Sequence, residues 1–167
     1  MKNGNLIDFI NNVSFEIDIF KEHQNLVDKK ESKIISELVM HKILYFIYGG
    51  FYKNFKKELW DPKFEAWQYG PVEVQYREIS LYALNNNYHV SEDLLKKKFL
   101  FNESNFTDEE IKYLKNLIIA LIKMGVYNLV EFSHETDPWI NNSNKIIGQN
   151  KIDKKEIKDY FKSKLII

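Results

Sequence analysis

The sequence contains no cysteine among its 167 residues. This absence excludes disulfide bonds, thiolate metal sites and catalysis by a cysteine nucleophile. It suits a reducing compartment, so we expect a cytoplasmic protein. Histidine is also scarce: the four histidines, at positions 23, 41, 89 and 134, lack the spacing of metal ligands. We therefore expect no metal site and no cofactor.

Long apolar runs and a surplus of one charge are missing as well. No stretch approaches the roughly 18 apolar residues of a membrane span, and residues 1–5 are not followed by the apolar run of a signal peptide. We therefore expect no contact with a membrane. Lys plus Arg and Asp plus Glu both number 24. This balance disfavours nucleic acid as a partner, although a local basic patch stays compatible with it.

The residues that are present predict a globular, mainly helical protein. Apolar residues make up 44% of the chain and aromatic residues 15%, which is enough for a core. We expect a single globular unit, a compact bundle of about six to seven helices with one small strand or hairpin element around residues 59–69. Residues 1–33 would form an N-terminal helix and a connector, and residues 34–161 the main helical domain.

The N-terminal half carries two helical patterns. Apolar residues from Leu6 to Phe20 recur at spacings of three and four, which predicts a helix with one face in the core. From about Ile34 a broad apolar stripe predicts a central, mostly buried helix. Gly49-Gly50 lies late in that stripe and indicates either close approach of another backbone or a kink.

The C-terminal half carries clearer helix boundaries. Thr107 and Glu110 form the pattern of a capping box, and Gly125 stands where a helix would end. A short helix is expected over 127–132. A second capping-box pattern, Asp153 to Glu156, predicts a last helix, and a short helix over 93–101 is a weaker expectation.

The stretch Phe64–Glu78 combines alternating aromatic residues with a Gly-Pro pair. Trp67 and Tyr69 stand two residues apart, as residues on the same face of a strand do. Gly70-Pro71 is then expected to stop the strand and open a helix, because Pro suits the first helical position. The second arm of a small hairpin is expected near Leu59-Trp60.

Known catalytic motifs are absent from the sequence. His134-Glu135 resembles the start of a zinc-protease motif, but the second histidine is missing because position 138 is Pro. We therefore expect no enzyme and no catalytic residues, while a hydrolase that pairs His134 with a carboxylate only in the fold stays open. Structural roles for His134 and Trp139 are an alternative to partner binding: the imidazole could tie down a loop, and the indole could fill a gap in the core.

Several motifs together resemble those of the Panacea domain, a family of SocA-like, phage-associated antitoxins. They are His41–Phe46, Phe64–Val72, Tyr76-Arg77-Glu78, Ser133-His134-Glu135 and Pro138-Trp139. The resemblance covers roughly residues 34–161. It implies a mainly helical domain with a small strand element, no catalytic residues, and a toxin protein as the partner, neutralised by direct contact. It also implies that a member can act as an adaptor that delivers its toxin to an AAA+ protease.

The leading hypothesis is accordingly a protein-binding antitoxin. Tyr, Trp and Arg dominate the hot spots of protein interfaces, which favours the signature and its neighbours as the partner-binding residues. These candidates are Trp67, Tyr69, Gly70, Pro71, Tyr76, Arg77, His134 and Trp139. A DNA-binding autoregulator of its own operon is the alternative function, and an exposed aromatic surface would also permit a homodimer.

Overall fold

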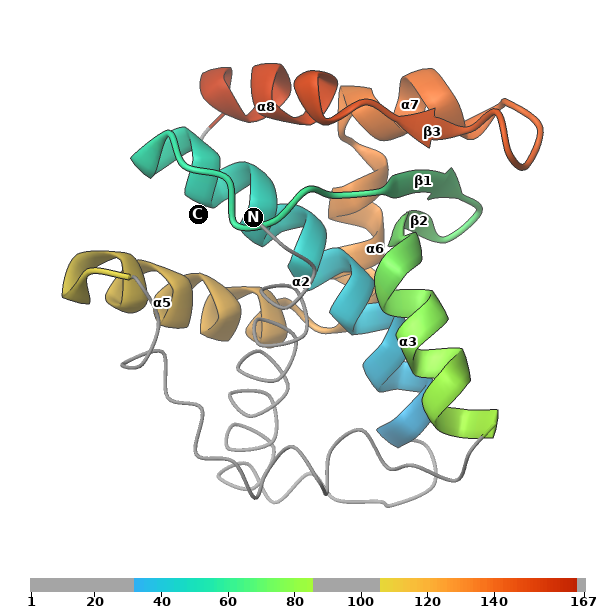
Figure 1. Cartoon of the computed structure of the whole chain (residues 1–167), viewed down its shortest axis with the longest axis horizontal. Helices are drawn as coiled ribbons and strands as arrows, with labels where there is room; N and C mark the ends of the chain where they lie inside the picture. Colours follow the sequence, from blue (N-terminus) through green and yellow to red (C-terminus); the bar gives the residue numbers. More distant parts are fainter. Residues whose placement is uncertain (1–31, 86–105, 165–167) are drawn as a thin grey trace.

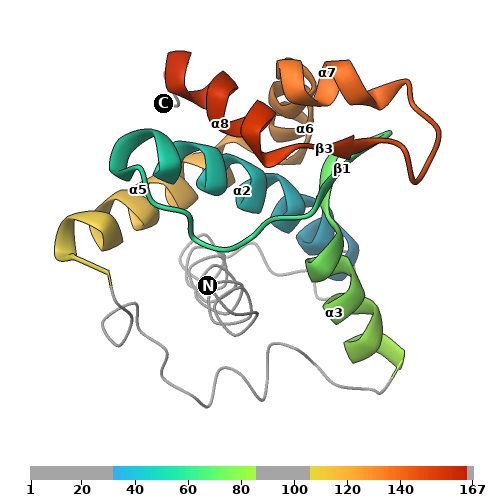
Figure 2. The same ribbon diagram turned by 45° about the horizontal axis from the view of Figure 1, so that its top comes forward.

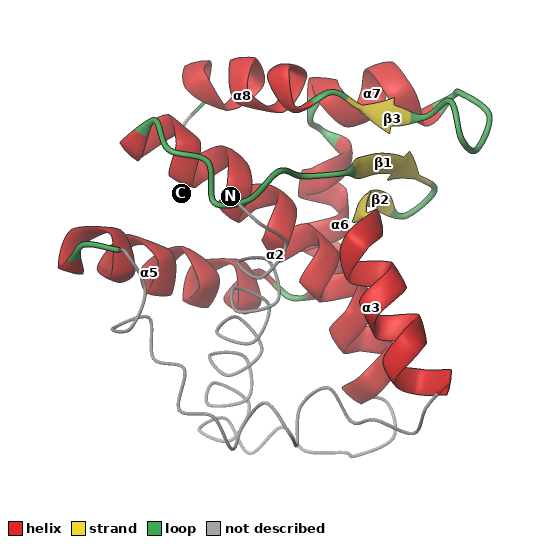
Figure 3. Cartoon of the chain, in the orientation of Figure 1, coloured by secondary structure: helices red, strands yellow, loops and turns green. Residues whose placement is uncertain are grey.

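The computed structural model describes residues 32–85 and 106–164. Within these ranges the chain forms six helices and a small three-stranded antiparallel sheet, so the expected mainly helical fold with a small β element is confirmed. Figure 3 shows the strands gathered at one end of the helical body. The helix expected over Leu6–Phe20, nearly all of the connector, and the helix expected over 93–101 lie outside the described residues.

Helix α2 (Ser32–Phe55) is the centre of the fold. Its middle section, from Met40 to Phe51, is buried at every position. Helices α5, α6 and α8 and strand β2 all contact it, with α7 and α8 on one side and α5 on the other (Figure 1). A helix covered on all sides must be apolar all round, and this explains why the sequence shows a band rather than a narrow stripe.

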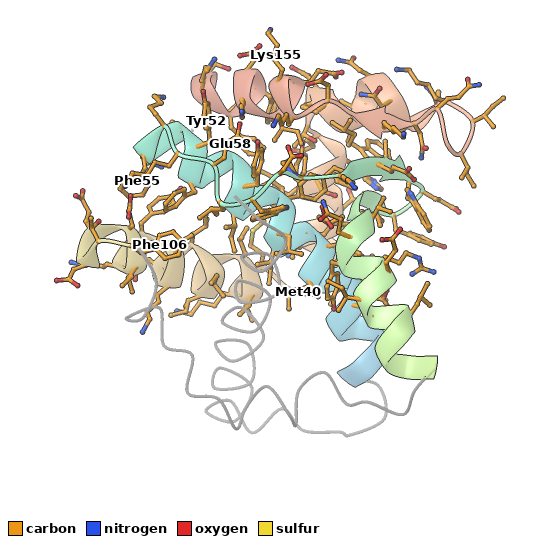
Figure 4. All side chains as sticks on the ribbon, in the orientation of Figure 1. Met40, Tyr52, Phe55, Glu58, Phe106 and Lys155 are labelled. Carbon is orange, nitrogen blue, oxygen red and sulfur yellow. The ribbon has the colours of Figure 1, made fainter. Side chains whose placement is uncertain are left out.

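Aromatic side chains fill much of the core around α2. The ring of Tyr45 meets those of Phe64 and Phe161 edge-on, and Phe46 stacks on Phe132 with 4.7 Å between ring centroids. Figure 4 shows side chains between α2 and α5, among them Phe55 of α2 and Phe106, which precedes α5. Such pairs stabilise a core somewhat beyond the area that they bury.

The sheet corrects the expected position of the hairpin. Strand β1 (Phe64–Trp67) pairs with β2 (Gly70–Glu73) on one side and with β3 (Lys151–Ile152) on the other. Leu59-Trp60, expected to form the second arm, is instead a buried bend. Tyr69 belongs to the two-residue turn with Gln68, so it does not share a strand face with Trp67. The third strand has only two residues, too short for a periodicity to reveal it.

The structure also corrects the expected role of Gly70-Pro71, which begins β2 rather than a helix. Pro71 is tolerated because β2 lies at the edge of the sheet. Opposite Pro71, Ala66 uses both of its backbone groups on Asn150, so the missing N–H of the proline removes no bond between β1 and β2. Helix α3 (Val74–Asn85) starts three residues later than Pro71 and leads away from the sheet (Figure 2).

The C-terminal helices largely follow their sequence signals. Helix α5 (Asp108–Met124) begins with the expected reciprocal capping box of Thr107 and Glu110. Gly125, with φ +78°, ends α5 and precedes α6 (Val126–His134), which contains the helix expected over 127–132. Helix α7 (Asp137–Ser143), which starts at Asp137-Pro138, was not predicted.

Helix α8 (Lys154–Ser163) begins as expected at Asp153, whose side chain accepts a hydrogen bond from the Lys155 N–H. Glu156, expected to complete a capping box, instead accepts a hydrogen bond from Asn142 of α7. The glutamate thereby ties two helices together.

In the part of the chain that the structure describes, no single helix is long and apolar enough to cross a membrane. Helices α5 and α6 taken together meet that criterion by length and composition, but they are bent by 106° at the break between them.

Gly49 is required by a close approach, as expected, but the approaching group is a side chain rather than a backbone. A Cβ atom added at Gly49 would overlap the ring of Phe161 on α8. The absence of a side chain at this position is therefore what allows α8 to pack against α2.

We expect Gly49→Ala to lower the free energy of unfolding by about 2–3 kcal/mol, because it overpacks the contact between α2 and α8. An ordinary Gly→Ala change inside a helix would stabilise it by about 1 kcal/mol. A decrease in the free energy of unfolding would therefore by itself indicate overpacking at this position. Urea unfolding of Gly49→Ala, Phe161→Ala and the double variant checks this. In the Phe161→Ala background the Gly49→Ala change should cost nothing, and an undiminished cost there would contradict the packing argument.

Candidate protein-binding site

The β1–β2 hairpin rests on a glycine that has no room for a side chain. Gly70 has φ +97°, a conformation that other residues rarely adopt. An added Cβ would also lie 2.6 Å from Lys42 Cε and closer still to Ser133 Oγ. Gly70 is therefore needed both for the turn and for the close packing of the hairpin on α2 and α6.

Beneath this glycine lies Lys42, a fully buried lysine in the middle of α2. Its Nζ donates a hydrogen bond of 3.1 Å to the carbonyl oxygen of Pro71. No carboxylate among the described residues forms an ion pair with it at salt-bridge distance. Burial lowers the pKa of the Lys42 amine to about 7, because removal from water disfavours the charged form. The lysine therefore holds the hairpin by a hydrogen bond rather than by an ion pair.

Glu73, at the end of β2, is buried as completely as Lys42. Its carboxylate accepts hydrogen bonds of 2.8 Å from the backbone N–H groups of Lys63 and Tyr76, and so caps the first turn of α3. Burial raises the pKa of this carboxyl group, while the backbone donors oppose the rise. Its own N–H donates to Nδ1 of His41 at 3.2 Å. Glu73 thus connects the hairpin, α3 and α2.

His41, in the middle of α2, is a buried histidine. Because Nδ1 accepts the N–H of Glu73, the neutral ring carries its proton on Nε2, which lies 3.8 Å from the Glu37 carboxylate. Burial lowers the pKa of His41, and the nearby Glu37 carboxylate opposes this effect. Arg77 lies 3.1 Å from the same carboxylate. The nearby imidazole of His41 and the charge of Arg77 hold the pKa of Glu37 below its usual value.

Arg77 also covers Trp67. Its guanidinium carbon lies 5.1 Å from the centroid of the indole, within the range of a cation–π interaction. The indole Nε1 donates a hydrogen bond of 2.9 Å to Glu65. Trp67 is therefore half-buried and held in one orientation by its neighbours on β1 and α3.

The other side of Trp67 meets the junction of α6 and α7. Trp139 Nε1 donates a hydrogen bond of 2.9 Å to the backbone carbonyl of Trp67. The ring of His134 stacks on Trp139, with 3.9 Å between centroids. Burial lowers the pKa of His134, and the nearby positive charge of Lys42 lowers it further. Two residues far from the hairpin in sequence thus contact its tip.

The family model described as "Antitoxin SocA-like, Panacea domain" matches residues 40–140, which include the central part of α2, the hairpin and the α6–α7 junction. The chain belongs to this family.

A curated relative of this Panacea domain, named Antitoxin SocA and found in Caulobacter vibrioides (strain NA1000 / CB15N), is 30% identical over 112 residues. The alignment covers 63% of this chain and 58% of that relative, so the chain spans little more than half of its length. No solved structure matches the chain. The family membership supports an antitoxin role in general terms.

The eight candidate residues of the Panacea domain do converge on the hairpin, but they differ in exposure. Gly70 and Pro71 are buried, and Tyr69 is 62% exposed. The other five, Trp67, Tyr76, Arg77, His134 and Trp139, are half-buried. Tyr69 therefore faces solvent, while Trp67 is partly covered. We call Trp67, Tyr69, Arg77, His134 and Trp139 the hairpin surface.

Sequence reasoning missed the buried support beneath that surface. Lys42, Glu73 and Ser133 are polar residues with no exposed area or almost none. A usable signal was present for one of them, since Lys42 interrupts an apolar run that otherwise predicts a buried helix. Among residues 32–85 and 106–164, no group of three His, Asp or Glu side chains could hold a metal ion.

The buried lysine makes the stability of the protein depend on pH. Between about pH 7 and about pH 10 the unfolded chain keeps the Lys42 proton while the folded chain has lost it, so stability rises with pH. The stability that the protein gains from this difference is complete above the pKa of Lys42 in the unfolded chain, and it is lost as the pH falls toward 7. We expect Lys42→Met to remove a slope of at most about 1.4 kcal/mol per pH unit.

Urea unfolding at several pH values from about 7 to about 9 measures that slope, and the exposed Lys112→Met variant on α5 is the matched control. Parallel pH profiles for Lys42→Met and the wild type would show that the amine keeps its ordinary pKa in the folded protein.

Proposed function

We propose that this protein is an antitoxin that neutralises a toxin by direct contact, with the hairpin surface as the contact region. The observation that carries the proposal is the exposed Tyr69, presented on a rigid turn beside the half-buried Trp67 and Arg77. Tyr, Trp and Arg are the residue types that most often dominate binding energy at interfaces. The family membership supports a toxin as the partner.

The rigidity of the turn favours binding. Trp67 is fixed by Arg77 and Glu65, and its backbone is fixed by Trp139. Side chains already held in one orientation lose little conformational freedom when a partner binds, so more of the contact energy contributes to affinity. The same argument favours a mechanism of steric occlusion, in which a preformed surface covers a functional part of the toxin.

This proposal gives the protein no catalytic step and places it in the cytoplasm with its toxin. His134, the residue on which the hydrolase alternative depends, lies flat against Trp139. Delivery of the toxin to an AAA+ protease rests only on the family resemblance and would be an addition to direct binding. DNA binding and a homodimer find no specific support in the hairpin surface.

We expect Tyr69→Ala to weaken binding of the protein encoded by the neighbouring gene by about tenfold or more, since loss of a hot-spot aromatic commonly costs at least that much. Trp67→Ala should weaken binding too, and should also release Arg77. Tyr127→Ala is the matched control, because Tyr127 is 88% exposed at the start of α6, the opposite end of that helix from His134.

Calorimetric titration of the two purified proteins measures the affinity, and rescue of growth in cells that express the neighbouring gene measures neutralisation. A folded Tyr69→Ala protein with unchanged affinity and unchanged rescue would show that the hairpin surface is not the contact region.

A further inference from the structure

The loop between α7 and β3 exposes two neighbouring isoleucines. Ile146 and Ile147 are 75% and 80% exposed, more than any other described aliphatic side chain among the large apolar residues. Single exposed apolar residues are common, but an adjacent pair at a loop tip forms a compact apolar projection. Neither residue was identified by motif, and neither contributes to the core.

Backbone and side-chain hydrogen bonds hold this loop in shape. The Gln149 N–H donates to the Ile146 carbonyl at 2.8 Å, and the Gly148 N–H donates to Asn150 Oδ1 at 3.0 Å. Asn150 is buried and bonds in both directions to Ala66 of β1, at 2.8 and 3.0 Å. The isoleucines are therefore presented on a preformed support, and binding through them requires little ordering of the loop.

The loop lies next to the hairpin surface. Lys151 pairs with Glu65 and Asn150 bonds to Ala66, so the preceding loop residues extend past the end of β1 at Trp67. The β1–β2 turn, which carries Tyr69, projects from the same end of the sheet (Figure 1). We call Ile146, Ile147 and Tyr69 the apolar tip.

The loop that carries Ile146 and Ile147 has charges of one sign. Residues 140–152 contain two lysines, Lys145 and Lys151, and no aspartate or glutamate. On the neighbouring strand, the Glu65 carboxylate stands opposite Lys151 and keeps its charge while it accepts the Trp67 indole N–H. Lys145 bonds to Asn142 and forms no salt bridge with a carboxylate of the described residues. A partner that covers this tip therefore gains from carboxylates placed around an apolar centre.

We propose that the apolar tip inserts into an apolar groove of the toxin that is bordered by Asp or Glu side chains. This rests on the proposed function and names the chemistry of its partner surface. A second copy of the same chain fits less well, because a symmetric contact through this loop would set lysines against lysines. A membrane surface fits less well too, since two lysines fall short of the basic face that membrane-surface helices use.

The double variant Ile146→Ser, Ile147→Ser tests the apolar centre, with Tyr127→Ser as the matched control on a distant exposed position. The variant Lys145→Gln, Lys151→Gln tests the charged rim, with the exposed Lys112→Gln as its control. The probe is the purified product of the neighbouring gene, studied by surface plasmon resonance at two salt concentrations. All variants alter exposed or partly exposed side chains, so their melting temperatures should stay near that of the wild type.

We expect the serine variant to weaken the complex about tenfold or more, mainly through faster dissociation. The glutamine variant should slow association several-fold and reduce its dependence on salt, because it removes long-range attraction. Both controls should bind as the wild type does.

The remaining outcomes separate this inference from the proposed function. If Tyr69→Ala and Trp67→Ala lose binding while the isoleucine and lysine variants do not, the hairpin surface remains the contact region and the proposed groove is contradicted. If the wild type binds no neighbouring product, both proposals fail. The serine variant could instead lose a homodimer that the wild type forms, or lose binding to phosphatidylglycerol vesicles. Either loss, with binding of the neighbouring gene's product unchanged, would also overturn the proposed groove.

Discussion

The hydrogen bond from the buried Lys42 amine to the Pro71 carbonyl is the contact on which the hairpin depends. It joins the middle of the central helix to an edge strand that would otherwise have an unpaired carbonyl in the interior. An unpaired buried polar group costs about 1–3 kcal/mol. Loss of either the amine or the carbonyl would therefore leave the other group buried at that cost. The constraint extends to Gly70, because any side chain there would displace the lysine.

A series of contacts beside this hydrogen bond connects the interior to the surface. Glu73 caps α3 and bonds to His41, and His41 faces Glu37, which binds Arg77. Arg77 then covers Trp67 at the surface. These residues therefore mostly fix one hairpin, and only the outermost of them reach solvent.

The sites at which sequence reasoning failed share a physical cause. Gly70-Pro71 has the local chemistry of a helix start, yet an edge position in a sheet suits a residue without an N–H equally well. Strand β3 has only two residues and is defined by its pairing with β1. Glu156 has the spacing of a capping box, but Asn142 of α7 competes successfully for its carboxylate. In each case a partner distant in sequence decided between two locally acceptable structures.

The sequence by itself determined the fold class, the central helix, the α5 capping box and the family, because periodicity, caps and an ordered set of motifs are local properties of the chain. Tertiary structure alone decided that Glu73 is buried and that His134 and Trp139 meet the hairpin. It also decided that Tyr69, Ile146 and Ile147 remain in solvent. The reason is that burial depends on which elements pack over a residue, and contacts such as Trp139 to Trp67 join residues 72 positions apart.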